Sequence, residues 1–278
     1  MDFSGNDDYI IDENPACRKT NPVLADHNFL AVKSGPGHHA IMKLTAPTRA
    51  GILLRRYKRF LADIRLEDGS TLTAHCPNSG AMLGCSTPGS PAIISRAANP
   101  LRKYPWTLEM VRENDTWIGV NTSRTNSLVR EALENRTIND FGAVAAIVPE
   151  IRVSARSRLD FLLRAHGQDI YLEVKNCSLA KDGVAMFPDA VTARGTRHLL
   201  ELEQLLTEGH RAAVLFCVQR ADAQQFAPAA HIDPLYAQTL ARVHDRGVSV
   251  LVYQAEVHPE EIRIVRKLPL TLAQHTEW

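Results

Sequence analysis

The chain has 278 residues, 45% of them hydrophobic and 23% charged, with a formal net charge of +1. This composition is ordinary for a soluble globular protein of two domains, and a net charge near zero neither requires nor excludes a nucleic-acid partner. No apolar run reaches the roughly 18 residues of a membrane-spanning helix, no secretory signal opens the chain, and the five cysteines show neither disulfide nor zinc spacing. We therefore expect a cytoplasmic protein without a membrane partner, and association into homo-oligomers stays open.

Residues 1–41 are the first segment in chain order. They show no sustained hydrophobic period and are interrupted by Asn, Asp, Pro and Gly. Such a segment lacks the apolar density that offsets the entropy of ordering a chain. We predict a loosely ordered N-terminal extension, with Met42 as the start of the folded unit.

Residues 42–122 read as a small β-domain. Five strand signals follow one another in the strings GILLRRYKRFLADIRL, STLTAHC, PAIISRA, TLEMVRE and WIGVN. Turn residues separate them, notably at 67–69 and 114–115, and no convincing helix intervenes. Five short strands predict a closed or half-closed barrel of the OB type, which we expect to bind DNA.

Residues 123–278 predict a second domain in which helices and strands mix. Helical spacing marks three segments, at residues 127–136, 190–209 and 234–247. Strand signals mark five more, at residues 150–165, 169–176, 211–219, 248–257 and 261–270. A helix, a hairpin and then alternating helices and strands predict a mixed α/β sandwich, so the whole chain is expected in the α/β class.

The predicted hairpin within residues 157–176 carries charges among side chains that favour burial. A turn centred on Gly167-Gln168 places Asp160 opposite Lys175. Side chains alternate between the faces of a strand, so Asp160, Glu173 and Lys175 share one face. Directly opposed Cβ atoms lie about 5 Å apart, which brings two carboxylates and a lysine together.

Two carboxylates beside a lysine suit a hard divalent cation. Mg²⁺, or Mn²⁺ in its place, takes one or two carboxylates together with waters and phosphate oxygens. Held by Asp160 and Glu173, it would activate a water and stabilise a phosphodiester under attack, while Lys175 would position that water. The order of the three residues resembles the D-x(n)-E-x-K signature of PD-(D/E)XK nucleases. The alternative is a cross-strand ion pair on a solvated face.

Two predicted helices offer further polar residues. Glu131, in the helix before the hairpin, is a candidate for one more carboxylate at the same metal. Arg194 and Arg197 recur with His198 and Glu201 at helical three-and-four spacing, so they form one polar face that could bind phosphate. Exposure on a solvated helix face is an equal alternative for both groups.

The string RRYKR, at residues 55–59, places four positive charges around one aromatic ring. The basic residues are Arg55, Arg56, Lys58 and Arg59, and the ring is Tyr57. Along a strand they could neutralise phosphates of a non-specifically bound DNA backbone while the ring offers a stacking surface. The alternative is a charged edge strand that resists aggregation.

Six unusual strings point to one family. They are RRYKRFLADI (55–64), TAHCPNSGAML (73–83), SRLDFLL (157–163), YLEVKN (171–176), FPDAVTARGTRHLLEL (187–202) and IDPLYAQTL (232–240). Over residues 51–270 the chain thereby resembles the bacterial and archaeal sugar fermentation stimulation protein A family. The resemblance implies an OB-like N-terminal domain, a C-terminal domain of PD-(D/E)XK nuclease type and non-specific DNA binding. The family name implies a link to sugar metabolism.

Rival functions stay open at this level. The first is a Mg²⁺-dependent nuclease, and the second is a DNA-binding regulator of sugar-metabolism genes without catalysis. The intact acidic pair favours the nuclease, because two carboxylates facing an anionic ligand repel it unless a cation lies between. Weaker alternatives are a sugar-responsive pocket and a metal site in the loop HCPNSGAMLGC, where Cys76 and Cys85 lack the close spacing of zinc ligands.

Overall fold

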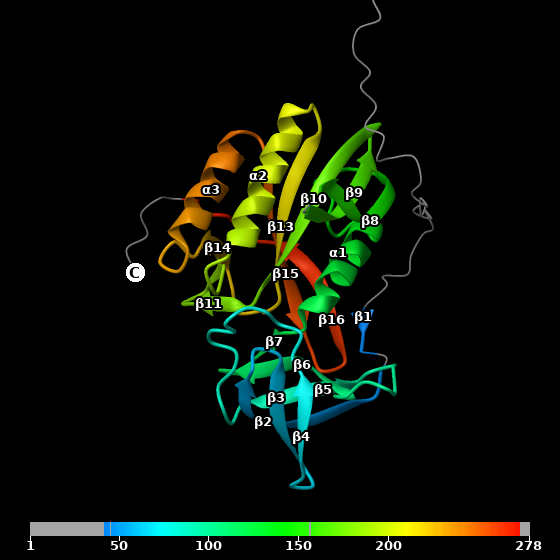
Figure 1. Cartoon of the computed structure of the whole chain (residues 1–278), viewed down its shortest axis with the longest axis vertical. Helices are drawn as coiled ribbons and strands as arrows, with labels where there is room; N and C mark the ends of the chain where they lie inside the picture. The colour runs from blue at the N-terminus through cyan, green and yellow to red at the C-terminus, as the bar shows by residue number, and fades with distance from the viewer. Residues whose placement is uncertain (1–41, 45, 156, 273–278) are drawn as a thin grey trace, which may run out of the picture.

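The computed structural model describes residues 42–44, 46–155 and 157–272, which form two parts stacked along the long axis of the molecule (Figure 1). A small barrel occupies one end and a larger α/β part the other. The predicted extension, residues 1–41, lies outside the described residues. No helix in the described ranges is long and apolar enough to cross a membrane.

Six strands build the barrel. They are β2 (Thr48–Tyr57), β3 (Leu61–Leu66), β4 (Thr71–His75), β5 (Pro91–Arg96), β6 (Trp106–Glu113) and β7 (Thr116–Gly119). Their order is β4-β3-β2-β5-β6-β7, and a further pairing of β4 with β6 at His75 and Thr107 closes five of them into a ring. All five predicted segments form strands, but the first forms both β2 and β3, so the ring consists of β2 to β6 and the last predicted strand, β7, lies beside β6.

The first predicted strand of the barrel is two strands in the structure. The chain turns back after Tyr57, and Lys58 and Arg59 have φ angles of 48° and 65°. Gly and Asn are the usual residues at such left-handed positions, and neither stands here. The sequence pattern therefore does not mark this turn. The basic string 55–59 ends β2 and begins the turn, instead of running along one strand as predicted.

A seven-stranded mixed sheet forms the α/β part, in the order β1-β16-β15-β13-β10-β9-β8. Its strands are β1 (Met42–Lys43), β8 (Val144–Ser154), β9 (Ser157–Ala165), β10 (Gln168–Cys177), β13 (Arg211–Val218), β15 (Ser249–Val257) and β16 (Glu261–Lys267). A smaller sheet contains β11 (Leu179–Lys181), β12 (Val184–Phe187) and β14 (Gln225–Pro228). The predicted strand 150–165 covers the end of β8 and all of β9, which pair with each other as a hairpin.

Met42 and Lys43 correct the predicted limits of the first domain. They form β1, which pairs antiparallel with β16 at the edge of the large sheet. The chain therefore contributes a strand to the α/β part before it builds the barrel. A short 3-10 helix, η2 (Thr122–Arg124), leads back from the barrel to that part.

Helices cover both faces of the large sheet. The three predicted helices are present as α1 (Thr125–Glu134), α2 (Ala193–Thr207) and α3 (Pro234–Asp245). Alternation along the strands gives each face its own core, because Phe161 and Leu172 pack in the cluster that includes α1, whereas Leu162 and Tyr171 pack in the cluster of α2 and α3. The α/β part is therefore a sandwich of helices on a sheet, as predicted.

Candidate metal centre

The β9–β10 hairpin sets the position of the acidic pair. It turns at His166 and Gly167, whose φ angles are 52° and 74°, and Phe161 pairs with Leu172. Continuing that register brings Asp160 level with Glu173, so the predicted register, with Asp160 opposite Lys175, is wrong by two residues. A slip of two residues leaves every side chain on its original face. The shared face predicted for the triplet is therefore retained.

Asp160 lies where the two strands of the hairpin separate. The ladder between β9 and β10 ends at Phe161 and Leu172, and β10 continues along β13. The carboxylate takes the place of the missing backbone partner, since its Oδ2 accepts a hydrogen bond of 2.8 Å from the backbone N–H of Val174. Its Oδ1 accepts another of 2.8 Å from the side-chain amide of Asn126 in the first turn of α1. Both donors are neutral, so they fix the orientation of the carboxylate without neutralising its charge.

Glu173 is 3% exposed and has two unlike oxygens. Its Oε1 contacts both Nζ of Lys175 and Nδ1 of His198. Its Oε2 is buried and has no hydrogen-bond partner among the described residues. Because a buried, unpaired carboxylate oxygen costs free energy, Oε2 suits a cation ligand better than a structural ion pair.

His198 reaches Glu173 from α2 and is itself 3% exposed. Nε of Arg194, one helical turn earlier, donates a hydrogen bond of 3.4 Å to Nε2 of the imidazole. With Nε2 accepting, the imidazole proton lies on Nδ1 and is donated to Oε1 of Glu173. This chain of two hydrogen bonds keeps Oε1 engaged and leaves Oε2 as the available oxygen.

The two carboxyl groups have opposite pKa shifts. Burial, with the negative charge of Glu173 beside it, raises the pKa of Asp160 to about 6. Burial also acts to raise the pKa of Glu173, but Lys175 and His198 outweigh it and hold that pKa below its ordinary value. A cation between the groups would relieve both the burial and the mutual repulsion.

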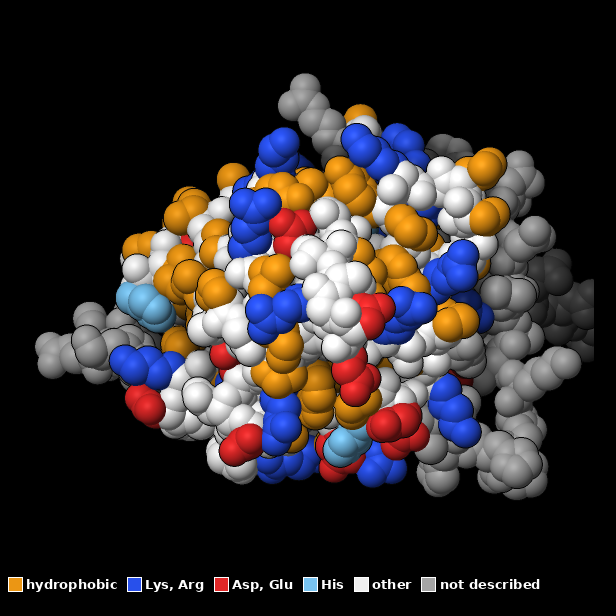
Figure 2. Space-filling model, turned by 90° about the horizontal axis from the view of Figure 1, so that it is seen from below, with side chains coloured by type: hydrophobic (Ala, Val, Ile, Leu, Met, Phe, Trp, Pro, Cys, Tyr) orange, Lys and Arg blue, Asp and Glu red, His pale blue; other side chains and the backbone are white. Residues whose placement is uncertain are grey.

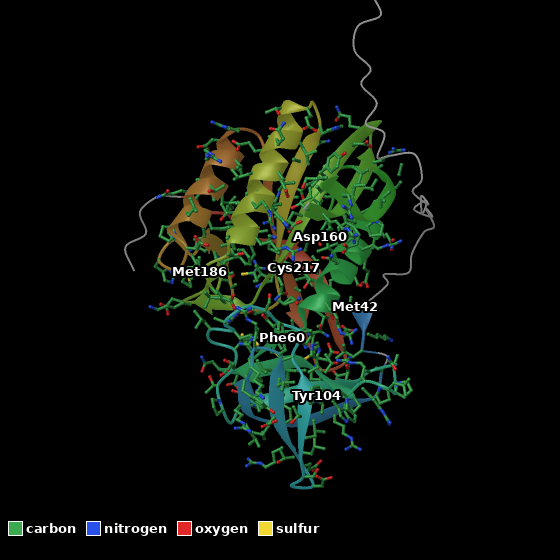
Figure 3. The ribbon with its side chains drawn as sticks, in the orientation of Figure 1. Met42, Phe60, Tyr104, Asp160, Met186 and Cys217 are labelled. Atoms are coloured by element: carbon green, nitrogen blue, oxygen red, sulfur yellow. The ribbon has the colours of Figure 1, made fainter. Side chains whose placement is uncertain are left out.

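A groove between the barrel and the α/β part gives access to the pair. Its volume is about 570 Å³, and its walls include Arg59, Asn78 and Gly80 from the barrel together with Asp160 and Glu173. A separate region of about 420 Å³ meets it at the acidic pair and continues between the β8–β9 hairpin and α2. Figure 3 places Phe60, next to Arg59 in the chain, at the end of the barrel nearest Asp160. The acidic pair is thus reached from the junction of the two parts.

Part of the predicted basic string holds the barrel together. Nε of Arg55 donates to Asp63 at 2.8 Å, and its guanidinium lies 4.6 Å from the ring centre of Tyr57, whose hydroxyl also donates to Asp63. The guanidinium of Arg56 donates to the backbone carbonyls of residues 59, 78, 80 and 81. These two arginines and the tyrosine are engaged within the barrel.

The rest of the string is available to a ligand. Lys58 and Arg59 are exposed, and Arg59 lines the groove. Arg194 and Arg197 are also exposed on α2 and line the region beside the acidic pair. The end of the barrel away from the α/β part, seen in Figure 2, instead mixes Lys and Arg with acidic and apolar side chains. The groove is therefore the better candidate for phosphate contacts.

Glu131 is not brought to the acidic pair. Its helix, α1, packs on the face of the sheet opposite to Glu173 and His198. Burial raises the pKa of Glu131, the backbone N–H of Met42 acts against this, and Glu134 adds to it. The same helix contributes Asn126 instead. The predicted helix began at Ser127, so the sequence analysis missed this residue.

The donor set of the candidate centre consists of two carboxylates. Within the described residues, no three His, Cys, Asp or Glu side chains gather in a metal-binding cluster. Two carboxylates alone fit Mg²⁺ or Mn²⁺, which keep several waters and take substrate phosphate oxygens. Cys76 and Cys85 are buried and free of disulfides, the Cys76 thiol contacts Sδ of Met82 at 3.5 Å, and neither belongs to a metal-binding cluster of the described residues.

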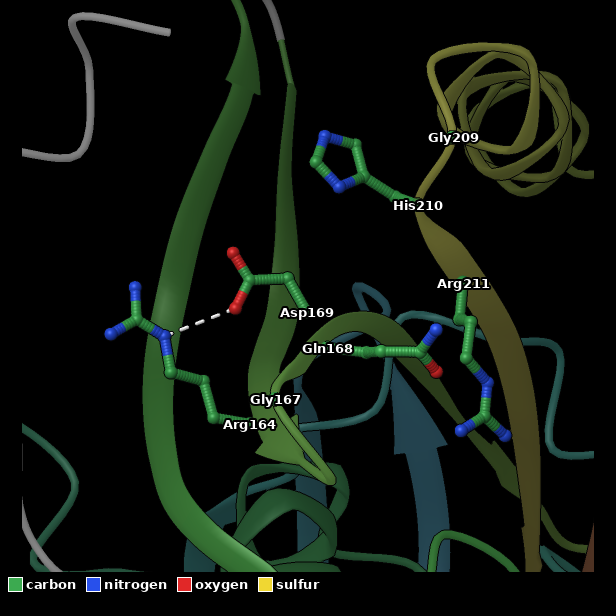
Figure 4. A pocket seen from close by; sticks show the side chains of 7 residues that line it. All are labelled: Arg164, Gly167, Gln168, Asp169, Gly209, His210 and Arg211. Atoms are coloured by element: carbon green, nitrogen blue, oxygen red, sulfur yellow. Dashed lines mark hydrogen bonds and ion pairs between the residues drawn. The ribbon is translucent and has the colours of Figure 1, made fainter. Parts of the chain in front are cut away.

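A pocket at the turn of the hairpin offers a contrast (Figure 4). It is lined by Arg164, Gly167, Gln168, Asp169, Gly209, His210 and Arg211. Its carboxylate, Asp169, accepts a hydrogen bond of 3.0 Å from Nε of Arg164. With its acidic group already paired, this pocket lacks the features that single out Asp160 and Glu173.

Comparison with known proteins identifies the family. The family model "SfsA N-terminal OB domain" matches residues 54–120, and "Sugar fermentation stimulation protein RE domain" matches residues 123–261. A sugar fermentation stimulation protein homolog of Desulfotalea psychrophila is 54% identical over 220 residues, which cover 79% of this chain and 91% of the relative. The chain belongs to the sugar fermentation stimulation protein family. The homolog of Geobacter sulfurreducens is 47% identical over 229 residues, or 82% of this chain and 98% of the relative.

A solved structure supports the same fold. It is described as the structure of Pyrococcus furiosus SfsA in complex with Ca²⁺, and it matches with a TM-score of 0.76 at 26% identity. The match covers 83% of this chain and 99% of that one. The predicted mixed α/β class with an N-terminal OB domain is confirmed, and so is the resemblance to this family.

Proposed function

We propose that this family member binds a divalent cation, Mg²⁺ or Mn²⁺, between Asp160 and Glu173 and cleaves phosphodiester bonds of DNA held non-specifically in the groove. The observation that carries the proposal is Oε2 of Glu173, a buried carboxylate oxygen without a partner among the described residues. It lies beside a second carboxylate whose pKa is raised to about 6. The relative described in complex with Ca²⁺ is consistent with an oxygen-rich cation site in this fold.

Each residue of the centre has a distinct role. When bound, the cation supplies a Lewis acid that stabilises negative charge and lowers the pKa of water. Asp160 and Glu173 provide its anionic ligands, and Asn126 and His198 hold these carboxylates in orientation. Lys175 positions the attacking water and offsets developing negative charge. The exposed Arg59 and Arg194 of the groove, together with Arg197 of the adjoining region, take the phosphates.

A second candidate is DNA binding without cleavage, as a regulator of sugar-metabolism genes. The OB-type barrel and the names of the relatives favour it. The acidic pair disfavours it, because a metal-free binder would present two buried carboxylates to an anionic backbone. The nuclease is therefore the leading proposal.

The deciding experiment measures metal binding and cleavage on the same set of proteins. Wild type should bind Mn²⁺ by calorimetry and nick supercoiled plasmid with Mg²⁺ or Mn²⁺, whereas Asp160→Asn and Glu173→Gln should lose both. Asp169→Asn is the matched control, since Asp169 lies on the same hairpin and is already paired with Arg164. Nicking that survives in the Glu173→Gln variant, or metal-free nicking, would refute the proposal. Metal binding without nicking of any substrate would favour the regulator.

A further inference from the structure

We infer that the centre has a second phosphate-binding surface, here called the second arm, built by Arg152, Arg158 and Arg197. A DNA strand would then run past Asp160 and Glu173 and contact the protein before and after the reacting bond. The first arm is the barrel side of the groove with Arg59. This inference rests on the proposed function, because it concerns the same centre. It adds the path of the strand and assigns phosphate contacts to Arg152 and Arg158 beside Arg197.

The shape of the site shows two ways to the acidic pair. The groove between barrel and α/β part shares four residues with the region between the β8–β9 hairpin and α2, namely Asp160, Glu173, Arg194 and His198. The acidic pair is the meeting point of these two spaces and not the blind end of either. A polymer that continues beyond its reacting bond in both directions fits such a site.

The charges along the second space match a phosphate backbone. Arg152 and Arg158 are direct partners across the β8–β9 ladder, and both are exposed. Arg158 precedes Asp160 by two positions on β9, so the two side chains leave the strand on the same face. Arg197 completes the lining from α2. Three guanidinium groups therefore lie on the same side of the sheet as the acidic pair.

Two features of this arm are unfavourable unless an anion binds. Like charges directly opposite each other on neighbouring strands repel, and Arg152 faces Arg158 in this way. Glu150 reduces this repulsion only slightly, because its carboxylate lies 3.9 Å from Arg158 and both side chains are more than half exposed to solvent. The hydroxyl of Ser157, which lines the same space, is buried and has no hydrogen-bond partner among the described residues. A phosphate would relieve the repulsion and accept from this hydroxyl.

The test is the salt dependence of DNA affinity in chelator, on a 20-base-pair duplex of arbitrary sequence. Each lost phosphate contact lowers the slope of log affinity against log salt by about 0.9. Arg152→Gln/Arg158→Gln should therefore reduce the slope by about 1.8. The control is Arg65→Gln/Arg136→Gln, which removes two exposed arginines that line neither space and should leave the slope unchanged. An unaltered slope in the first variant, or an equal loss in the control, would overturn the second arm.

Two further measurements keep the arm separate from the chemistry and from folding. The salt slope is measured in chelator, without a cation, and therefore does not depend on cleavage. If the wild type never cleaves DNA, the proposed nuclease function is refuted, but the salt slope still shows whether the second arm binds phosphate. Arg197→Gln alone, at an exposed helix position, should reduce the slope by about 0.9 without lowering the melting temperature. No change in the Arg197→Gln slope would also count against the arm.

Discussion

At the scale of single residues, the acidic pair shows how two adjacent carboxyl groups acquire different proton affinities. Glu173 contacts the charged Lys175 and the imidazole of His198, whereas Asp160 is held by the neutral donors Asn126 and Val174. Burial penalises both anions, but Lys175 contacts Glu173 directly and acts on Asp160 only as the smallest of several influences. Asp160 is therefore the group at which protons would compete with the proposed metal cation.

The raised pKa of Asp160 predicts an unusual effect of pH on stability. Between its ordinary pKa and about 6, the folded chain holds more of this proton than the unfolded chain does. The contribution of Asp160 to the free energy of unfolding therefore falls as pH rises through that window. Asp160→Asn should raise the free energy of unfolding by about 1–2 kcal/mol at pH 8 in chelator. The variant removes the unfavourable buried charge, and this gain exceeds the loss of one of the two hydrogen bonds that Asp160 accepts. Denaturant titrations at pH 5 and pH 8 measure this, and a variant less stable at pH 8 would indicate a structural ion pair.

Metal affinity should follow the same titration. A proton on Asp160 must leave before this carboxylate can bind a cation, so affinity falls as pH falls through about 6. We expect the Kd for Mn²⁺ to rise up to about tenfold for each pH unit below that value. Calorimetry between pH 5 and pH 8 measures it. A Kd that is flat over this range would remove Asp160 from the ligand set.

His198 is expected to act as a positioning residue for Glu173. His198→Leu removes the hydrogen bond to Oε1, and loss of such an outer contact typically weakens metal affinity by about 10–100-fold. His198→Asn places an amide donor near the position of Nδ1 and should recover most of that affinity. Calorimetry with Mn²⁺ gives the Kd values, and DNA affinity in chelator should stay the same in both variants. Equal loss in the Leu and Asn variants would assign His198 a packing role.

At the scale of elements, the strands and their faces could be predicted from the sequence, whereas two of the turns between them could not. The β9–β10 hairpin and the face of its charged residues follow from the period of two, but the register depends on a turn at His166-Gly167. The turn at Lys58 and Arg59 was not predicted, because Lys and Arg have no preference for turns and yet adopt left-handed φ angles there. Periodicity reports which residues share a face, whereas turn geometry reports which residues are opposite.

The β2–β3 turn separates Arg56, which is engaged within the barrel, from Lys58 and Arg59, which we propose contact DNA. Arg56→Gln removes hydrogen bonds to four backbone carbonyls and should lower the free energy of unfolding by about 2–4 kcal/mol. Lys58→Gln/Arg59→Gln should leave the melting temperature unchanged and reduce the salt slope of duplex binding by up to about 1.8. A normal melting temperature for Arg56→Gln, or an unchanged slope for the double variant, would contradict this division.

At the scale of the whole molecule, the site combines segments that are distant in sequence. Asn126 precedes Asp160 by more than thirty positions, and Arg59 precedes it by about a hundred. The period of a strand or helix carries no information on such contacts, so the sequence predicted the triplet and the basic string but not their arrangement around one groove. The carboxylate of Glu131 had the right chemistry, but its helix lies on the other face of the sheet.

The two parts of the molecule meet closely at the barrel loop after β4 and at the end of β7. The backbone N–H of Met82 donates to Oδ2 of Asp189 at 2.8 Å, and Gly119 donates to the backbone carbonyl of Gln219 at 2.9 Å. A Cβ on Gly80 would lie 2.3 Å from Oδ1 of Asp189, which is far inside van der Waals contact. The absence of a side chain at Gly80 therefore allows the barrel to approach the segment before α2, and this approach forms one wall of the groove.

Gly80→Ala should force this junction apart. We expect a lower melting temperature, by a few degrees, and a DNA affinity in chelator reduced by about tenfold, because Arg59 would move away from the wall that carries Arg194. Asp189→Ala removes the obstructing carboxylate together with its hydrogen bond to Met82, so it should be destabilising alone. In that background, however, Gly80→Ala should cost much less, since residues in contact are not additive. Additive losses across this double-mutant cycle would show that Gly80 acts within the barrel loop and that the groove does not depend on close contact between the two parts.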